Sequence, residues 1–472
     1  MENSRYTKFL LLIAGLGGLL YGIDFGVIAV SMPYIKALRI YTDAEVSWIV
    51  GAVMFGGILA SATAGWLCDR FGRKRMIVFG TGLFLIAIPI VCFSGTSLSV
   101  MLTGRVLQGM SAGYMAVVMP MYLAECLPAD RRGKGTGIFQ LFLGIGLVSA
   151  ALMGVLISHF LGASDSAVDD SVKGFAWRLN FWWTLLPVTA LFVGAFWLKE
   201  SPVWIEKVSS SRFRVSSGSS TLNPKPETRN PQPSTRNPKL ETRNPQPSTR
   251  NPKLETLFQR KYVIPFLLAL LVLTFNKTIG MSSIVAYAVA LFQKAGLSGS
   301  LGNVGDLALK TTNLLVTLVA VSLVERKGRT WLLKVGTAGL SVGLAAIGGL
   351  FLAIERGWIV ASPTSGFIML GAFLAMQVFY ALGPGICVWL VLSELMPTRI
   401  RANGMAIALF SNQFVAWGLA SSFFPMVNAW GYGPVFFMFA ATGVLYFLTV
   451  LFIPETKGKS LEEIEQLWSK EK

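Results

Sequence analysis

Residues 46–75 read VSWIVGAVMFGGILASATAGWLCDRFGRKR, an apolar run that ends in one aspartate and four basic residues. An α-helix needs roughly 20 apolar residues to cross the hydrocarbon core of a bilayer. Lysine and arginine concentrate in the short loops on the cytoplasmic side of a membrane. The stretch therefore predicts a transmembrane helix whose carboxyl-terminal end lies at the cytoplasm.

The composition of the whole chain has the same character. Its 472 residues are 53% hydrophobic and 14% charged, whereas soluble globular proteins carry roughly 25% charged residues. Disordered chains, secreted disulfide scaffolds and ordinary cytosolic enzymes are thereby excluded. The net charge of +17 is carried by short loops between apolar runs, so no nucleic-acid partner is expected. The four cysteines have no metal-ligand spacing, and we expect neither a metal nor a cofactor.

Twelve apolar segments of membrane-spanning length follow one another, which predicts an all-α membrane protein with twelve transmembrane helices. The segments are approximately 9–30, 46–68, 76–94, 99–122, 137–160, 179–198, 262–292, 306–324, 332–354, 366–395, 404–427 and 433–453. An even number of spans places both termini on one side of the membrane.

Basic residues are more numerous in the loops on the side of the termini than in those of the opposite side. The loop at 70–75 alone has four of them, whereas the few bases of the opposite side are partly balanced by Asp165, Asp169 and Asp170. Because cytoplasmic loops are enriched in lysine and arginine, we predict cytoplasmic termini. We expect the protein in the plasma (inner) membrane.

One long hydrophilic stretch, 207–258, divides the spans six and six. From Thr228 to Glu255 it alternates TRNPQPS with TRNPKLE. Frequent proline opposes helix and no apolar face is present, so this stretch is interpreted as a disordered cytoplasmic linker. A lipid-binding basic patch or a translated repeat are the alternatives. The domains are then an N-terminal six-helix bundle at 1–206 and a C-terminal one at 259–472 with a short tail.

The two halves carry matching motifs at corresponding helix ends. The pairs are GWLCDRFGRK (65–74) with LVERKGR (323–329), PMYLAECLPADRRG (120–133) with SELMPTRIR (393–401), and ESP (200–202) with PETKG (454–458). Parallel repeats of this kind form transporters whose halves rock about a central site.

These six motifs resemble those of the sugar porter family of the major facilitator superfamily, which contains bacterial sugar–proton symporters and animal glucose facilitators. The resemblance covers nearly the whole chain apart from the repeat-containing linker. It implies two pseudo-symmetric six-helix bundles that move a sugar or a related polyhydroxy solute by alternating access. We expect a monomer whose partners are the solute, protons and the lipid bilayer.

The charged residues of the motifs gather at the cytoplasmic helix ends and are interpreted as a gate. They are Asp69, Arg70, Arg73, Glu125, Arg132, Glu200, Glu325, Arg326, Arg329, Glu394, Arg401 and Glu455. Such groups can pair within one half or across the halves, and cross-half pairs would close this side in one state and break in the other. Each exposed pair is worth only about 0–1 kcal/mol. The alternative, anchoring of topology by basic loops, does not explain an acid at the matching position of each half.

Asp24 and Arg105 are the candidates for proton coupling. Helical rise places both at a similar depth in the outer half of the membrane. Unpaired charges at this depth are costly, so the two are expected to pair. The resemblance agrees, since proton-coupled members carry an acid and an arginine at these positions. The alternative is a static ion pair that ties two helices together.

The resemblance also implies a sugar site built from polar side chains of several spans. The matching positions are Gln140, Asn313, Trp389 and Asn412, and Asn276 and Ser282, which replace the family's residues in the seventh span, are further candidate ligands. Amides can exchange hydrogen bonds with sugar hydroxyls, and an indole can cover the apolar face of a sugar. For each residue singly, interhelical packing is a rival interpretation. The Gly-Pro-Gly beginning at Gly383 would break the tenth span.

Lys277 departs from the family pattern, which reads Gln-Gln-x-x-Gly-x-Asn where this chain has Asn276 to Ser282. A cation near mid-depth is costly and points to function. We expect Lys277 either to bind an anionic group of the substrate, such as that of a sugar acid, or to share Asp24 as a counter-ion. The third alternative is a lysine in a wet cavity without a role.

The leading prediction is a proton-driven secondary transporter that imports its solute, and not an enzyme. An uncoupled facilitator and a non-transporting membrane sugar sensor are the alternatives. Loss of function through the linker is a further one. An ATP-driven pump is disfavoured because no phosphate-binding loop motif is present.

Overall fold

The computed structural model describes residues 4–127, 129–162, 168–217, 260–396, 401–457, 459 and 463. These residues form a sequence of helices without strands. The helices are α1 (Ser4–Ala37), α2 (Asp43–Phe71), α3 (Arg73–Cys92), α4 (Leu98–Cys126), α5 (Ala129–Leu161), α6 (Asp170–Trp182), α7 (Leu185–Phe196), α8 (Pro202–Ser217), α9 (Arg260–Thr278), α10 (Met281–Ala295), α11 (Ser300–Lys327), α12 (Arg329–Glu355), α13 (Pro363–Leu382), α14 (Pro384–Leu395), α15 (Arg401–Trp430) and α16 (Tyr432–Leu451).

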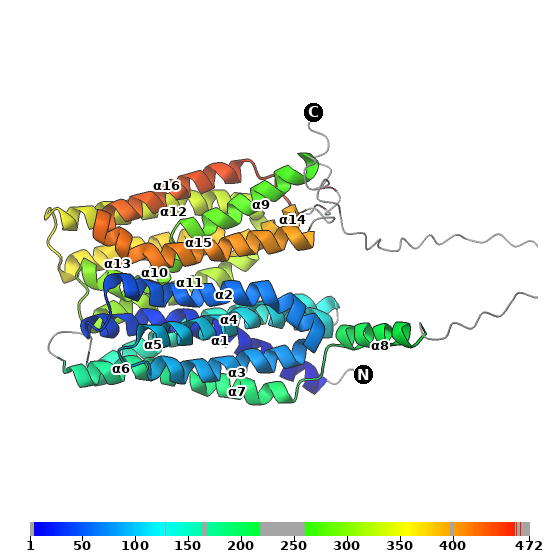
Figure 1. Ribbon diagram of the computed structural model, residues 1–472. Coiled ribbons are helices and arrows are strands. Elements are labelled where there is room, and N and C mark those ends of the chain that lie inside the picture. Colours follow the sequence, from blue (N-terminus) through cyan, green and yellow to red (C-terminus); the bar gives the residue numbers. More distant parts are fainter. Residues whose placement is uncertain are drawn as a thin grey trace, which may run out of the picture.

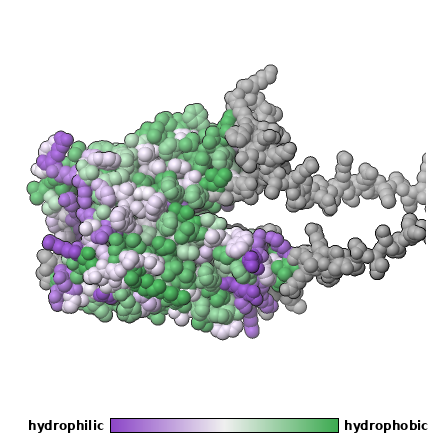
Figure 2. Space-filling view, viewed as in Figure 1, coloured by the Kyte–Doolittle hydropathy of each residue, from purple (hydrophilic) through white to green (hydrophobic). Residues whose placement is uncertain are grey.

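Twelve stretches of the described chain are long and apolar enough to cross a membrane, which confirms the predicted all-helical membrane fold. Three of these spans are built from two helices each, namely α6 with α7, α9 with α10, and α13 with α14. The helices form two bundles, α1–α7 and α9–α16, that lie side by side (Figure 1). The surface of the bundles is largely apolar along the helices, and hydrophilic residues gather at their ends (Figure 2).

Two of the broken spans break where the backbone chemistry requires it. The break between α9 and α10 is at Gly280, whose φ is 76°, in the left-handed region that favours glycine. The break between α13 and α14 is at Gly383 and Pro384. Proline has no N–H to donate to the preceding turn. The prediction that Gly-Pro-Gly interrupts the tenth span is confirmed.

Small residues let neighbouring helices approach closely within a bundle. α1 packs along α5, and α2 packs along α4. A Cβ atom at Gly22 of α1 would overlap the carbonyl oxygen of Leu143 in α5. Close backbone approach through glycine is a usual basis of helix packing in membranes.

The helix α8 changes one predicted boundary. It runs from Pro202 to Ser217 and so extends into the stretch 207–258 that the sequence predicts to be a linker. Residues 218–258, which include the proline-rich repeat, lie outside the described residues.

Candidate functional site

Both termini of the helical core lie at one face of the molecule. α1 begins there at Ser4 and α16 ends there at Leu451 (Figure 1). We call it the terminal face, and we call the other face, where α1 ends at Ala37, the opposite face.

In the N-terminal bundle, a charged cluster at the terminal face is centred on Arg73, the first residue of α3. Its Nη2 donates a 2.8 Å hydrogen bond to Oε1 of Glu125 in α4. Its Nη1 lies 3.3 Å from Oδ1 of Asp69 in α2. The backbone N–H groups of Arg73 and Lys74 donate to Oε1 of Glu200 at 2.8 and 3.1 Å. The cluster therefore joins three helices and the segment before α8.

The C-terminal bundle has a matching cluster centred on Arg329, the first residue of α12. Its Nε donates a 3.3 Å hydrogen bond to Oε1 of Glu394 in α14. The backbone N–H groups of Arg329 and Thr330 donate to the two carboxylate oxygens of Glu455, each at 3.1 Å. The contacts of Arg329 are thus equivalent to those of Arg73. Glu394 corresponds to Glu125, and Glu455 corresponds to Glu200. The motifs that repeat in the sequence therefore also form equivalent clusters in the structure.

A glycine with positive φ precedes each of these two helices. Gly72 has a φ of 93° and Gly328 a φ of 92°. A Cβ atom at Gly72 would overlap the carboxylate of Glu200, and one at Gly328 would overlap that of Glu455. Glycine therefore lets each carboxylate reach the unpaired N–H groups of the helix start, where negative charge is stabilised by the helix dipole.

The remaining predicted gate residues take less part in these clusters. Arg70 stacks over the rings of Trp66 and Phe71, at 5.5 and 5.7 Å from their centroids. Glu325 and Arg326 are exposed. The side chains of Arg132 and Arg401 lie outside the described residues.

The bundles contact one another in the half of the molecule toward the opposite face. There, Asn428 of α15 donates a 3.0 Å hydrogen bond to Asp43 of α2. The backbone N–H of Phe424 donates to Ser47 at 3.2 Å, and the ammonium of Lys36 lies 3.7 Å from the centroid of the Phe424 ring. The ion pairs of Arg73 and Arg329 described above stay inside their own bundles. In this conformation, therefore, the described ion pairs of the two terminal-face clusters do not connect one bundle to the other.

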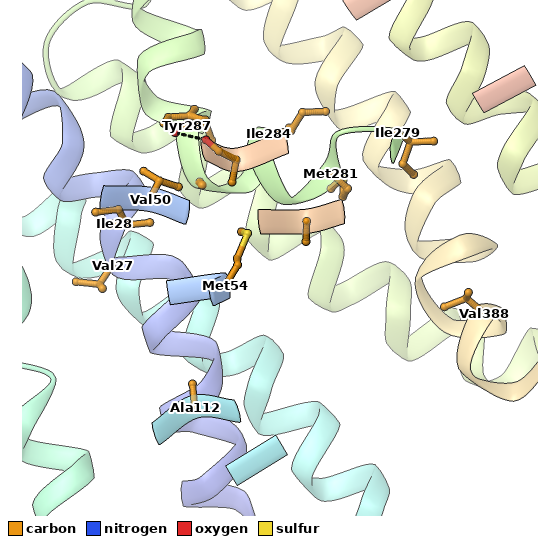
Figure 3. Packing of buried hydrophobic residues seen from close by; sticks show 14 of the residues in the cluster. Val27, Ile28, Val50, Met54, Ala112, Ile279, Met281, Ile284, Tyr287 and Val388 are labelled. Atoms are coloured by element: carbon orange, nitrogen blue, oxygen red, sulfur yellow. Dashed lines mark hydrogen bonds between the residues drawn. The ribbon is translucent and has the colours of Figure 1, made fainter. Parts of the chain in front are cut away.

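An apolar layer continues this contact toward the middle of the molecule. Ile28 of α1 and Val50 of α2 lie near Tyr287 of α10 (Figure 3). The hydroxyl of Tyr287 donates a 2.9 Å hydrogen bond to the carbonyl oxygen of Ala420. α10 is therefore bonded to α15 of its own bundle and packed against α1 of the other.

Asp24 and Arg105 are both buried, with exposed fractions of 0% and 1%, so neither faces lipid. The two are within electrostatic reach of each other, but the expected direct ion pair is not formed. Arg105 instead donates a 2.6 Å hydrogen bond to Oε1 of Gln108, one turn along α4, and a 3.4 Å one to the carbonyl oxygen of Ile49. The guanidinium is occupied, and both carboxylate oxygens of Asp24 have no hydrogen-bond partner in the described structure.

A second buried pair, which the sequence analysis missed, lies in α11. The ammonium of Lys310 is 2.6 Å from Oδ2 of Asp306, and both side chains are almost fully buried. Lys310 also reaches the carbonyl oxygen of Gly26 in α1 at 3.4 Å. The hydrogen bond from Lys310 to Gly26 therefore crosses the interface between the bundles, two residues along α1 from Asp24.

Several predicted sugar ligands take part in hydrogen bonds between helices. Asn276 donates to the carbonyl oxygen of Pro384 at 3.3 Å. Asn412 donates to that of Leu273 at 2.9 Å. Asn313 accepts a 2.7 Å hydrogen bond from Gln377. These hydrogen bonds support the interpretation that the amides pack helices together. They do not exclude a role in solute binding, because each amide can still donate or accept further hydrogen bonds.

The other predicted ligands differ in exposure. Gln140 in α5 is exposed, and Trp389 in α14 is 46% exposed, whereas Ser282 near the start of α10 is buried. Lys277, in the last turn of α9, is partly buried and forms neither an ion pair nor a side-chain hydrogen bond with the described residues. Both carboxylate oxygens of Asp24 are without a hydrogen-bond partner, so the alternative in which Lys277 and Asp24 bind each other is not formed in this conformation.

The chain matches known proteins over almost its full length. The sequence profile of the family described as "Sugar (and other) transporter" matches residues 10–468. The galactose-proton symporter of Escherichia coli K12 is 28% identical over 467 residues, which cover 98% of this chain and 95% of that protein. The glucose transporter GlcP of Staphylococcus epidermidis is 29% identical over 475 residues, 98% of this chain and 97% of the relative.

Solved structures show the same fold. The crystal structure of a D-xylose-proton symporter superposes with a TM-score of 0.74 at 21% identity and covers 96% of this chain and 100% of that chain. An inward-open conformation of the xylose transporter XylE from E. coli gives a TM-score of 0.73 at 21% identity and covers 97% and 99% of the two chains.

Proposed function

Because this chain belongs to the sugar porter family of the major facilitator superfamily, we propose that it imports a sugar or related polyhydroxy solute together with protons, by alternating access. The chain is a membrane-embedded sugar transporter and not an enzyme. Relatives named galactose-proton and arabinose-proton symporters support coupling to protons. The terminal face is the cytoplasmic one in this proposal, because the basic loops gather there.

The observation that carries the proposal is the buried, unpartnered carboxylate of Asp24. An isolated carboxylate in a low-dielectric interior is costly to keep ionised, so Asp24 is available to bind a proton. Arg105 is buried in the same bundle, and a cation that approaches a carboxyl group favours release of its proton. A movement of α4 relative to α1 changes this balance, because it changes the distance between the two charges.

The contacts between the bundles supply the two states that alternating access needs. In this proposal the solute enters and leaves its site at the terminal face while the contacts of the opposite half are formed. Rocking of the bundles breaks the contacts of Lys36, Ser47 and Asp43 with α15 and brings the clusters of Arg73 and Arg329 together. Each exposed ion pair contributes only about 0–1 kcal/mol, so neither state is locked.

The roles of the candidate residues follow from this scheme. We assign proton coupling to Asp24 and Arg105. We assign solute binding to Gln140, Asn276, Lys277, Ser282, Asn313, Trp389 and Asn412. The charged motif residues at the terminal face form the gate, with Arg73 and Arg329 at its centre.

Uptake into proteoliposomes with an imposed pH gradient tests the proposal. The probes are labelled D-galactose, D-glucose, D-xylose and D-galacturonate. We expect accumulation of at least one probe above its external concentration and collapse of that accumulation on addition of an uncoupler. Asp24→Asn should still equilibrate the probe across the membrane but not accumulate it.

Asp169→Asn is the matched control, because it removes a carboxylate from the exposed residue before α6. Its accumulation should equal that of the wild type. Equilibration without accumulation by the wild-type protein would contradict proton coupling and indicate the uncoupled facilitator.

A further inference from the structure

Six charged side chains of the described spans lie more than five residues from either end of their span. They are Asp24, Arg105, Arg178, Lys277, Asp306 and Lys310. Charges at this depth in a membrane normally have a partner.

Three of the four cations have partners. Lys310 forms its ion pair with Asp306, Arg105 donates to Gln108 and to the carbonyl oxygen of Ile49, and Arg178 donates to the carbonyl oxygens of Cys92 and Gly174. Within the described part of the chain, Lys277 forms neither an ion pair nor a side-chain hydrogen bond. The unmatched cation is therefore Lys277.

The surroundings of Lys277 offer further donors for an anion. Lys277 belongs to the last turn before the break at Gly280, after which α10 starts with no side-chain cap. Ile284 is the first residue of α10 whose N–H is bonded back to the chain, to Gly280. The preceding N–H groups of this helix start are thus free of such bonds, and the hydroxyl of Ser283 is buried with no partner in the described structure. Lys277, the N-terminus of α10 and the unused hydroxyl of Ser283 thus fall within seven consecutive residues, on the two sides of the break at Gly280.

We propose that the solute is a monoanionic sugar acid whose carboxylate binds Lys277 at the start of α10. The inference rests on the proposed function, since it specifies the solute of that site. One unmatched cation balances one negative charge, which favours a carboxylate over a doubly charged phosphate. Half-helix N-termini bind anionic substrate groups in other transporter folds by the same physical means. Exposed Gln140 and the free capacity of Asn313 remain for the hydroxyl groups.

The test compares solutes that differ only in the anionic group. D-galacturonate is compared with D-galactose, and D-glucuronate with D-glucose, in proteoliposomes of wild type and Lys277→Gln. We expect the wild type to prefer each acid, and Lys277→Gln to lose about tenfold or more of the acid uptake while neutral-sugar uptake stays the same or rises, as for a lost charge-assisted hydrogen bond. Lys277→Arg should keep the preference.

Lys294→Gln is the matched control, because it removes a lysine from the exposed far end of the same span. It should leave the ratio of acid to neutral uptake unchanged. Stabilisation of the purified protein by each solute, measured as a shift in Tm, checks that Lys277→Gln is folded and reports binding without transport. Galacturonate should raise the Tm of the wild type and not that of Lys277→Gln, and galactose 6-phosphate should raise neither.

Two results overturn the inference. Transport of neutral sugars with no preference for the acids, unchanged in Lys277→Gln, contradicts the anionic solute and leaves the proposed function standing. A preference for galactose 6-phosphate over galacturonate contradicts the single charge. Absence of transport of every probe contradicts the proposed function itself, and so is distinguishable from both.

Discussion

Gly72 and Gly328 show how much a single residue contributes to the terminal-face clusters. Each has a backbone conformation that other residues adopt only with strain, and each leaves room for a carboxylate. The sequence predicts that acids and arginines gather here, because the motifs repeat. It does not predict that Glu200 and Glu455 accept hydrogen bonds from backbone N–H groups, because this depends on the backbone angle of the residue before each helix.

Gly72→Ala should therefore lower the stability of the protein. The positive φ alone costs about 1–3 kcal/mol for a residue other than glycine, and displacement of Glu200 adds to it. We expect a lower Tm of the purified protein and slower uptake. Gly328→Ala should have the same effect through Glu455.

Gly65→Ala is the control for this change, because a Cβ atom at Gly65 contacts nothing within 4 Å and alanine favours helix. Its Tm should be unchanged or higher. Equal Tm values for the variants at Gly65 and Gly72 would show that the close contact between Gly72 and Glu200 does not stabilise the protein.

For Asp24 and Arg105, helical rise predicts the depth in the membrane but not the hydrogen bonds. Helical rise correctly brings the two into one buried region. Whether they bond depends on competing partners, and the neighbouring amide of Gln108 binds the guanidinium at 2.6 Å. Periodicity and spacing contain no information on that competition.

Among the helices, α11 shows why the buried pair of Asp306 and Lys310 is not predicted from the sequence. The apolar run predicts a span that begins at 306, so Asp306 and Lys310 are expected near the membrane surface. The helix in fact begins at Ser300, which places both residues deeper, since each residue adds about 1.5 Å of rise. Polar residues shift the apparent end of a span, and the resulting error hides a buried pair.

Breaking this pair should cost more than removing it. Lys310→Met leaves the carboxylate of Asp306 buried without its cation, and loss of one partner of a buried pair costs about 3–5 kcal/mol. Asp306→Leu combined with Lys310→Met leaves no buried charge. We expect the Tm of the double variant to lie clearly above that of Lys310→Met. A double variant as unstable as the single one would show that the bond to Gly26, and not the charge, is what stabilises α11.

For the molecule as a whole, the sequence largely predicts the fold but not which face of the two bundles is closed. Apolar length predicts the twelve spans, and the repeated motifs predict two equivalent bundles. The face at which the bundles touch depends on contacts between residues far apart in the chain, such as Asp43 with Asn428. No local pattern identifies such a pair, because both states of a transporter share one sequence.

The closed opposite half leads to a prediction about the transport cycle. Asp43→Cys combined with Asn428→Cys places a thiol on each bundle at a contact where the native side chains are 3.0 Å apart. A short bifunctional thiol reagent with a reducible bond should link them and hold the opposite half closed, since rocking requires this contact to open. We expect uptake to stop on treatment and to return on reduction, whereas each single-cysteine variant should keep its uptake under the same reagent. The native cysteines are free and mostly buried, so the wild type should be unaffected as well. Full uptake by the linked double variant would show that the contact between Asp43 and Asn428 does not open during transport, and the two bundles would then have to move about a different interface.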